Sequence, residues 1–131
     1  MKNQVLSIEQ MKHLQELGVD TSKAKMAWYA TYETKLNRYN ELRVKDEVYD
    51  KHYPSMPNFT LQDMLEMMPY LLFGKYFFNI NKSSHNWWFI KYTDYLANND
   101  YEFFHSNDLL EAAYQCLCWL AENGYLKGGE K

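Results

Sequence analysis

Thiol and imidazole side chains are the groups in this chain best suited to bind a metal ion, and their spacing argues against one shared site. Cys116 and Cys118 lie two positions apart, so on a helix their side chains point about 200° apart. That divergence prevents them from chelating one ion or forming a disulfide. The four histidines are scattered, and none has a His, Asp or Glu partner four residues on: His13, His52, His85 and His105. We expect packing cysteines in a reducing compartment, with no metal and no cofactor; a zinc site assembled from distant positions is the open alternative.

A group of acids near the middle of the chain could supply a general base or bind a cation. It comprises Asp46, Glu47, Asp50 and the neighbouring His52. Residues 33–53 carry five charges of each sign, however, and such a mixture is typical of a solvated face.

Neither the methionines nor a search for catalytic motifs identifies a functional site. Met64, Met67 and Met68 could line an adaptable peptide-binding groove, but their helical spacing favours a core position. The sequence has no Gly-rich phosphate loop, no Gly-x-Ser-x-Gly and no His-Glu-x-x-His. A non-enzymatic protein is therefore favoured, and no catalytic residue is assigned.

Length and composition indicate one folded domain, residues 1–131, with an unusual aromatic content of 12 Tyr, 7 Phe and 4 Trp. The net charge of −3 arises in residues 96–126, which hold five acids and no Lys or Arg. These acids are Asp100, Glu102, Asp108, Glu111 and Glu122. The chain has no basic stripe that could neutralise several phosphates, and this argues against nucleic-acid binding. No apolar run reaches the roughly 18 residues of a membrane span, and no secretory signal is present, so we expect a cytoplasmic protein without membrane contact.

Capping patterns predict three helices, at about 7–17, 60–68 and 107–123. Ser7 with Gln10, and Thr60 with Asp63, have the spacing of a capping box. Asp108 with Glu111 resembles the same pattern, and the three helices are expected to end near Gly18, Pro69 and Gly124.

Alternating residues predict a strand at about 25–33, and Pro54–Asn58 is expected to be a loop. Between them, residues 34–53 have no dominant period. We favour a hairpin with a turn at Asn37–Arg38 that returns Tyr39–Val44 beside the first strand. A solvated helix with Leu36, Tyr39 and Arg43 on one side is the rival interpretation.

Residues 70–95 are predicted to form two aromatic strands. Pairing Ile80 with Trp88, Phe78 with Ile90 and Tyr76 with Tyr92 separates the two faces, and it requires an odd loop of three or five residues centred on Ser84. Leu96–Asp100 reads as a loop, with Tyr101–Phe104 as a short strand. The predicted fold is α+β: an antiparallel three- to four-stranded sheet packed with three helices.

The second face of this predicted hairpin combines large aromatic side chains with ammonium groups. Its members are Phe73, Phe77, Trp87, Phe89, Lys75 and Lys91. Either a helix of the same chain covers this face, or it is an interface with an unknown protein partner or in a homodimer.

Three parts of the chain carry a resemblance to known sequences: Leu6–Ala24, Phe59–Pro69 and the ending formed by Leu110–Tyr114 and Trp119–Tyr125. They resemble a family of small hypothetical proteins encoded by phages, prophages and mobile elements of gut Bacteroidetes. Residues 34–53 and 81–86 have no counterpart in the resemblance. The shared motifs are helix caps and helix faces, and the family has no established activity, so the resemblance implies no functional residue.

From these observations we expect a non-enzymatic protein-interaction module of phage or mobile-element type. The first alternative is a small enzyme or ligand-binding protein with a pocket between sheet and helices. The second is a nucleic-acid-associated protein that stacks bases on aromatic side chains.

Overall fold

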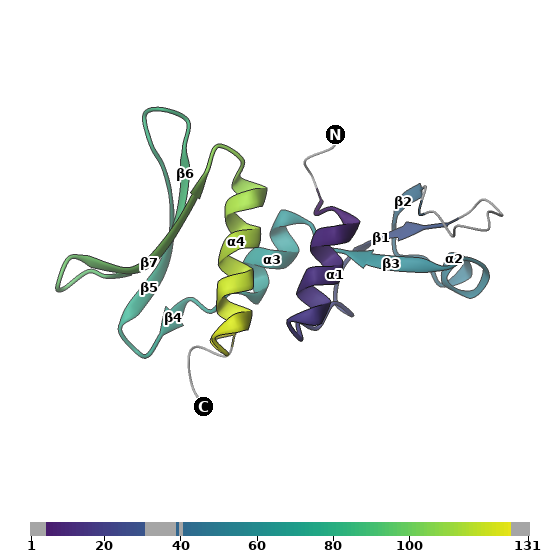
Figure 1. Ribbon diagram of the computed structural model, residues 1–131, viewed down its shortest axis with the longest axis horizontal. Coiled ribbons are helices and arrows are strands. Elements are labelled where there is room, and N and C mark those ends of the chain that lie inside the picture. The colour runs from purple at the N-terminus through teal and green to yellow at the C-terminus, as the bar shows by residue number, and fades with distance from the viewer. Residues whose placement is uncertain (1–4, 31–38, 40, 127–131) are drawn as a thin grey trace. The chain divides into compact units, whose positions relative to one another are not determined.

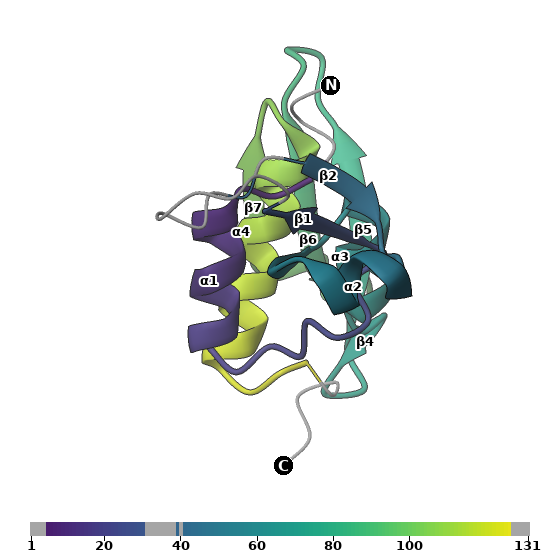
Figure 2. The same ribbon diagram turned by 90° about the vertical axis from the view of Figure 1, so that its right-hand side faces the viewer.

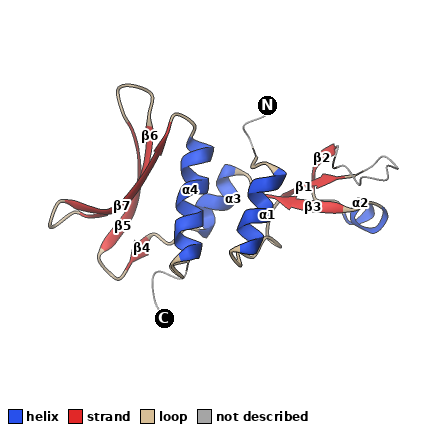
Figure 3. Ribbon diagram, in the orientation of Figure 1, coloured by secondary structure: helices blue, strands red, loops and turns tan. Residues whose placement is uncertain are grey.

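The computed structural model describes residues 5–30, 39 and 41–126. The chain divides into two compact units, Met1–Asp63 and Met64–Lys131, with the division falling inside a helix. The described residues form four helices and seven strands in two antiparallel sheets (Figure 3). The predicted α+β class is thus confirmed, although two sheets replace the single predicted one. The expectation of one domain stays a prediction, since compact units of this size occur both inside domains and as domains.

The first unit contains a three-stranded sheet of order β2-β1-β3, in which β1 and β2 are neighbours (Figure 2). Its strands are β1 (Met26–Tyr29), β2 (Glu41–Val44) and β3 (Ser55–Asn58). The favoured return of residues 39–44 beside the first strand is confirmed for Glu41–Val44, which pairs antiparallel with β1. The predicted turn at Asn37–Arg38 lies outside the described residues.

The expectation that residues 54–58 form a loop is wrong, because β3 is an edge strand that accommodates proline. The backbone N–H of Ala30 donates to the carbonyl of Pro54 (3.0 Å), and Ala27 pairs with Pro57. Backbone groups alternate along a strand, so the nitrogen of Pro57 points away from β1. A proline there breaks no ladder hydrogen bond.

Residues 47–52 form a short helix that the favoured hairpin did not include. The rival interpretation, a helix with Leu36, Tyr39 and Arg43 on one side, is wrong at Arg43, which lies in β2, and Leu36 is outside the described residues. In α2 (Glu47–His52), Asp46 caps the first turn by accepting from the N–H of Val48 (2.8 Å). The buried hydroxyl of Tyr29 donates to Asp50 (2.7 Å) and accepts from the N–H of Asp46 (3.2 Å). These bonds to β1 hold the short helix, which is below the length that is stable in isolation.

The predicted capping boxes begin the other helices of this half of the chain. In α1 (Ile8–Glu16), the Ser7 hydroxyl accepts from the N–H of Gln10 (3.1 Å), and the Gln10 side chain accepts from the N–H of Ser7 (2.9 Å). Thr60 and Asp63 make the reciprocal pair at the start of α3 (Leu61–Met67). Both boxes satisfy amides that a helix N-terminus leaves without partners.

The second unit is built on a four-stranded sheet of order β4-β5-β6-β7 (Figure 1). Its strands are β4 (Leu71–Leu72), β5 (Tyr76–Lys82), β6 (Trp88–Asp94) and β7 (Asn99–Ser106). Helix α4 (Leu109–Glu122) contacts β6 and β7 and buries Cys116, Leu117 and Leu120. The predicted third helix is therefore confirmed.

The pairing of β5 with β6 is displaced by two residues from the predicted register. Ile80 pairs with Ile90 and Phe78 with Tyr92, whereas the prediction paired Ile80 with Trp88. A two-residue displacement keeps every side chain on its predicted face, because faces alternate with a period of two. The predicted segregation of the faces is therefore right, although the partners are wrong.

The turn between these strands explains the displacement. The N–H of Ser83 donates to the carbonyl of Trp87 (2.8 Å), and the N–H of Asn86 donates to the carbonyl of Ser83 (3.3 Å). Asn86 adopts a left-handed conformation (φ 64°), as the last residue of three-residue hairpin loops commonly does. The loop is odd, as predicted, but it is centred on His85 instead of Ser84.

A second turn divides the segment that the sequence suggested as one strand from residue 70 onward. Phe73 and Gly74 both have positive φ (57° and 66°), and the N–H of Lys75 donates to the carbonyl of Leu72 (3.0 Å). Two successive positive-φ residues define a tight hairpin turn, which usually contains Asn-Gly or Asp-Gly. Phe-Gly is not that signal, so the turn was missed.

None of the helices in the described part of the chain has both the length and the apolar character required to cross a membrane.

The left-handed conformation of Asn86 predicts how the β5–β6 turn responds to substitution. We expect Asn86→Ala to lower the free energy of unfolding by about 1 kcal/mol, because a Cβ is strained in this region, and Asn86→Gly to lower it less. Urea denaturation of the three proteins measures the difference. Equal stability of the alanine and glycine variants would contradict the turn geometry.

Buried Tyr92 predicts a loss of stability at alkaline pH. Burial raises the pKa of Tyr92, whose hydroxyl donates to the carbonyl of Pro69 (2.7 Å). The unfolded chain releases this proton near pH 10 while the folded chain retains it, so the free energy of unfolding falls as pH rises above about 10. Urea midpoints at pH 8, 9.5 and 11 should fall less steeply in Tyr92→Phe than in the wild type. The variant Tyr70→Phe, at an exposed position, should keep the wild-type slope; identical slopes in all three proteins would refute the assignment.

Candidate functional site

The register of the four-stranded sheet divides its side chains between two faces. On one face Tyr92 and Phe104 contact Trp119 of α4, with ring centroids 6.2 and 5.6 Å apart. We call the opposite side the open face. It carries Phe77, Asn79 and Asn81 from β5, Phe89, Lys91 and Thr93 from β6, and Phe103 and His105 from β7. Figure 1 shows α4 on only one side of this sheet, and no described helix of this unit lies on the open face.

Four rings on the open face contact one another, and we call them the aromatic group: Trp87, Phe89, Phe103 and His105. The imidazole of His105 lies 5.2 Å from Trp87, 5.6 Å from Phe89 and 6.0 Å from Phe103, centroid to centroid. Trp87 and Phe103 nevertheless remain 41% and 46% exposed. Rings that already contact one another, while part of their surface meets solvent, form a wide, preorganised contact area.

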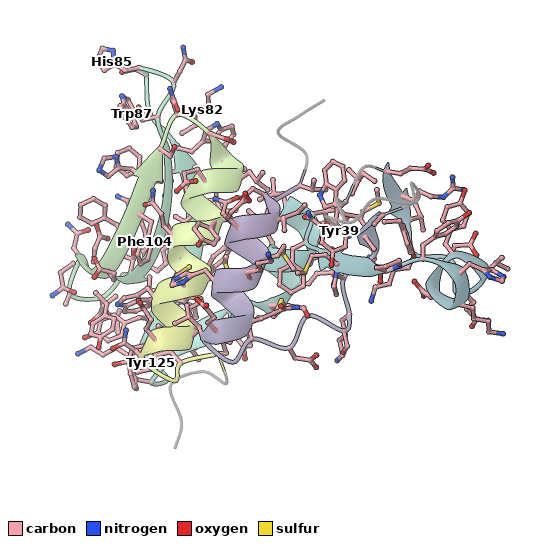
Figure 4. All side chains as sticks on the ribbon, turned by 45° about the vertical axis from the view of Figure 1, so that its right-hand side comes forward. Tyr39, Lys82, His85, Trp87, Phe104 and Tyr125 are labelled. Carbon is pink, nitrogen blue, oxygen red and sulfur yellow. The ribbon has the colours of Figure 1, made fainter. Side chains whose placement is uncertain are left out.

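The tip of the β5–β6 hairpin borders this group. Figure 4 shows Lys82, His85 and Trp87 at the tip, which extends past the first turn of α4 in Figures 1 and 2. The Lys82 ammonium lies 5.0 Å from the ring centroid of Trp88, its cross-strand partner.

A chain of polar side chains crosses the open face beside the aromatic group. Asn81 donates to Asn79, which donates to the Thr93 hydroxyl (3.0 Å). Thr93 in turn donates to Asp100 (2.8 Å), whose second oxygen lies 3.6 Å from the Lys91 ammonium. An ion pair this accessible contributes at most about 1 kcal/mol, so its main effect is to hold Lys91 over the ring of Phe89, 5.4 Å from its centroid.

Four of the six residues predicted for this surface lie at the open face. Phe89 and Lys91 are on β6 and Trp87 precedes it, while Phe77 lies toward the other end of the face and contacts Tyr95 (6.1 Å). The result is an aromatic group at the hairpin end, a polar centre and a smaller aromatic pair.

Phe73 and Lys75 belong instead to the β4–β5 turn. Phe73 contacts Tyr125 (5.1 Å) and Tyr101 (5.7 Å), and Figure 4 shows Tyr125 at the end of α4. The Lys75 ammonium lies 3.7 Å from Asp94 and 5.4 Å from the ring centroid of Tyr76. The turn at Phe73–Gly74 removes both residues from the ladder on which the sequence argument had counted alternation.

The sequence argument missed Phe103 and His105, which complete the aromatic group. β7 extends beyond the predicted Tyr101–Phe104 at both ends, so the predicted loop Leu96–Asp100 is wrong at Asn99 and Asp100. The exposure of its side chains alternates from Tyr101 to Ser106. The alternation of Phe103 and His105 with Glu102 and Phe104 was the available signal. An irregularity between Tyr92 and Thr93 shifts the register of β7; Tyr101 packs against Trp119 (5.8 Å), away from the open face.

Three residues considered for nucleophilic or acid–base chemistry, Cys116, Asp46 and Asp50, have structural positions. Cys116 is buried, and burial raises the pKa of its thiol, so the thiolate is scarce at neutral pH. Asp46 and Asp50 bond to α2 and Tyr29, as described above. Within the described residues no three His, Cys, Asp or Glu side chains gather where they could hold a metal ion.

Thr93 links the two halves of the polar chain, and its hydroxyl is the group to test. Thr93→Val keeps the shape but leaves Asn79 and Asp100 without this partner, so we expect the free energy of unfolding to fall by about 1–3 kcal/mol. Thr93→Ser keeps the hydroxyl and should retain more stability than Thr93→Val in urea denaturation. A valine variant as stable as the serine variant would show that the hydroxyl bonds contribute nothing.

Comparison of the chain with protein-family models, with curated proteins and with solved structures gave no match, so the resemblance to phage-encoded proteins stays a prediction.

Proposed function

We propose that this protein is a non-enzymatic interaction module that binds another protein through the open face of its four-stranded sheet. The observation that supports this most directly is the aromatic group, with Trp87 and Phe103 more than two-fifths exposed on a face without a covering helix of its unit. Aromatic side chains surrounded by polar ones are characteristic of protein interfaces. The phage or mobile-element origin implied by the resemblance belongs to the same proposal.

The energetics favour binding over mere exposure. Rings already in mutual contact lose little conformational entropy when a partner covers them. The neighbouring series of hydrogen-bonded side chains, from Asn81 through Thr93 to Lys91, supplies polar groups at the border of the apolar contact. Interfaces commonly combine such a central aromatic area with a polar rim.

Charge separates this proposal from the nucleic-acid alternative. Open sheet faces with aromatic rings also stack nucleic-acid bases, but such sites add cations that follow the phosphate backbone. Here Lys91 is paired with Asp100, and residues 96–126 contain no Lys or Arg. A protein partner accounts for this balance of charge better than a polyanion does.

Substitutions in the aromatic group provide the test. We expect Trp87→Ala and Phe103→Ser to fold as the wild type does. Each should lower the affinity for the partner by about tenfold or more, as substitution of central aromatic residues does at interfaces. Leu96→Ala is the matched control, because Leu96 is fully exposed in the β6–β7 turn, outside the aromatic group.

Partners captured by wild type and by Leu96→Ala but lost by both aromatic variants would be purified, and their affinity measured by titration calorimetry. Sedimentation at two concentrations tests for a homodimer in the same set of variants. Equal affinity of all four proteins for every captured partner, with no change in sedimentation, would refute the proposal. Salt-sensitive binding of single-stranded oligonucleotides that the aromatic variants lose would replace it with the nucleic-acid alternative.

A further inference from the structure

Among the described residues, no strand pairs with the outer edge of β7, the longest strand of the sheet. β7 has eight residues and is the last strand in the order β4-β5-β6-β7. The opposite edge is partly closed, since β4 pairs Leu71 and Leu72 with β5. An open edge strand is a template on which another chain can pair.

Hydrogen bonds at the β5–β6 hairpin identify the direction of each backbone group. The N–H of Phe78 donates to Tyr70 on the β4 side (2.9 Å), and the N–H of Ser83 donates to Trp87 on the β6 side (2.8 Å). Odd-numbered residues of β5 therefore direct their backbone groups toward β6, and their odd-numbered β6 partners do the same in return.

The same alternation continues into β7. Even-numbered residues of β6 direct their backbone groups toward β7, where Ile90 pairs with Phe104 and Trp88 with Ser106. The N–H and C=O groups of Phe103 and His105 accordingly point outward from the sheet. These two residues also contribute rings to the aromatic group, so one added strand could contact both their backbones and their side chains.

One of these outward amides already has an acidic acceptor. The N–H of Phe103 donates to the Glu102 carboxylate at 3.0 Å, in the direction where a neighbouring strand would place a carbonyl oxygen. Glu102 pairs with Tyr92 and, like Phe104, lies on the α4 side of the sheet. A chain that pairs here therefore meets an anion on one side of its backbone and aromatic rings on the other.

The charge along this edge selects the kind of strand. β7 itself carries two acids, Asp100 and Glu102, and no Lys or Arg. Asp100 is neutralised by Lys91, whereas no cation lies within ion-pair distance of Glu102 among the described residues. Pairing with a second copy of β7 would bring like charges together, which opposes association.

We propose that the edge of β7 binds a basic, extended segment of a partner protein as a fifth strand. In that segment apolar residues alternate with Lys or Arg. The backbone of each apolar residue pairs with Phe103 or His105 and its side chain contacts the aromatic group; the basic side chains lie beside Glu102. This inference rests on the proposed function and names the chemistry of its partner.

A synthetic peptide of four Lys-Val repeats, blocked at both ends and fluorescently labelled, is the probe. We expect it to bind the full chain in fluorescence anisotropy at low salt, and to protect the amides of Phe103 and His105 from hydrogen exchange. A peptide of four Glu-Val repeats should not bind. Glu102→Lys should lower the affinity for the Lys-Val peptide by at least about tenfold. Leu96→Ala should leave the affinity for this peptide unchanged.

Two methylated peptides separate strand pairing from contact with the face alone. N-methylation of the valines removes the donors that point at β7 and should abolish binding, whereas N-methylation of the lysines should leave it intact. Equal binding of both methylated peptides would overturn strand addition while the proposed function stands, and loss of binding by both would overturn the predicted alternation. Failure of the unmodified peptide to bind at concentrations on the order of 1 mM also overturns strand addition. So does protection of the β7 amides from hydrogen exchange that rises with protein concentration in the absence of peptide, because it would assign the edge to a second copy of the chain. The proposed function would still be decided by the captured partners of the Trp87 and Phe103 variants.

Discussion

The pairing of β6 between β5 and β7 is the constraint on which the second unit depends. Ile90 and Tyr92 are fully buried on the α4 side of the sheet. Because successive side chains of a strand point to opposite faces, burial of these two residues directs Phe89 and Lys91 to the open face. The core therefore determines which residues are available for binding, and any slip by one residue would bury the ammonium of Lys91 and expose Ile90.

Two features limit the apolar surface that the open face presents to water. The polar chain through Asn79 and Thr93 interrupts the apolar surface, which separates the aromatic group from Phe77. Mutual ring contacts around His105 also remove part of each ring from water. The surface that remains combines an apolar area with the outer edge of β7 and with Glu102, which has no ion-pair partner among the described residues. This combination supports an extended basic partner more than a covering helix.

Local chemistry made much of the fold predictable. The capping boxes at Ser7 and Thr60 depend on residues three positions apart, so the sequence reveals them directly. The separation of the hairpin faces was also predictable, because alternation survives an error of two residues. The strand over Ser55–Asn58 was not, since proline is acceptable there only at an edge, and the position of a strand within its sheet depends on pairing with distant residues.

The sequence alone thus determined where three helices begin, which class of fold they join and which face of the β5–β6 hairpin carries Phe77, Phe89 and Lys91. These properties follow from neighbours along the chain and from a period of two. Tertiary structure decided that Phe73 leaves the face through a positive-φ turn, and that Phe103 and His105 join it across the β6–β7 ladder. Pairing between strands brings together residues that no local pattern connects, and for that reason only the folded sheet revealed the complete aromatic group and the edge beside it.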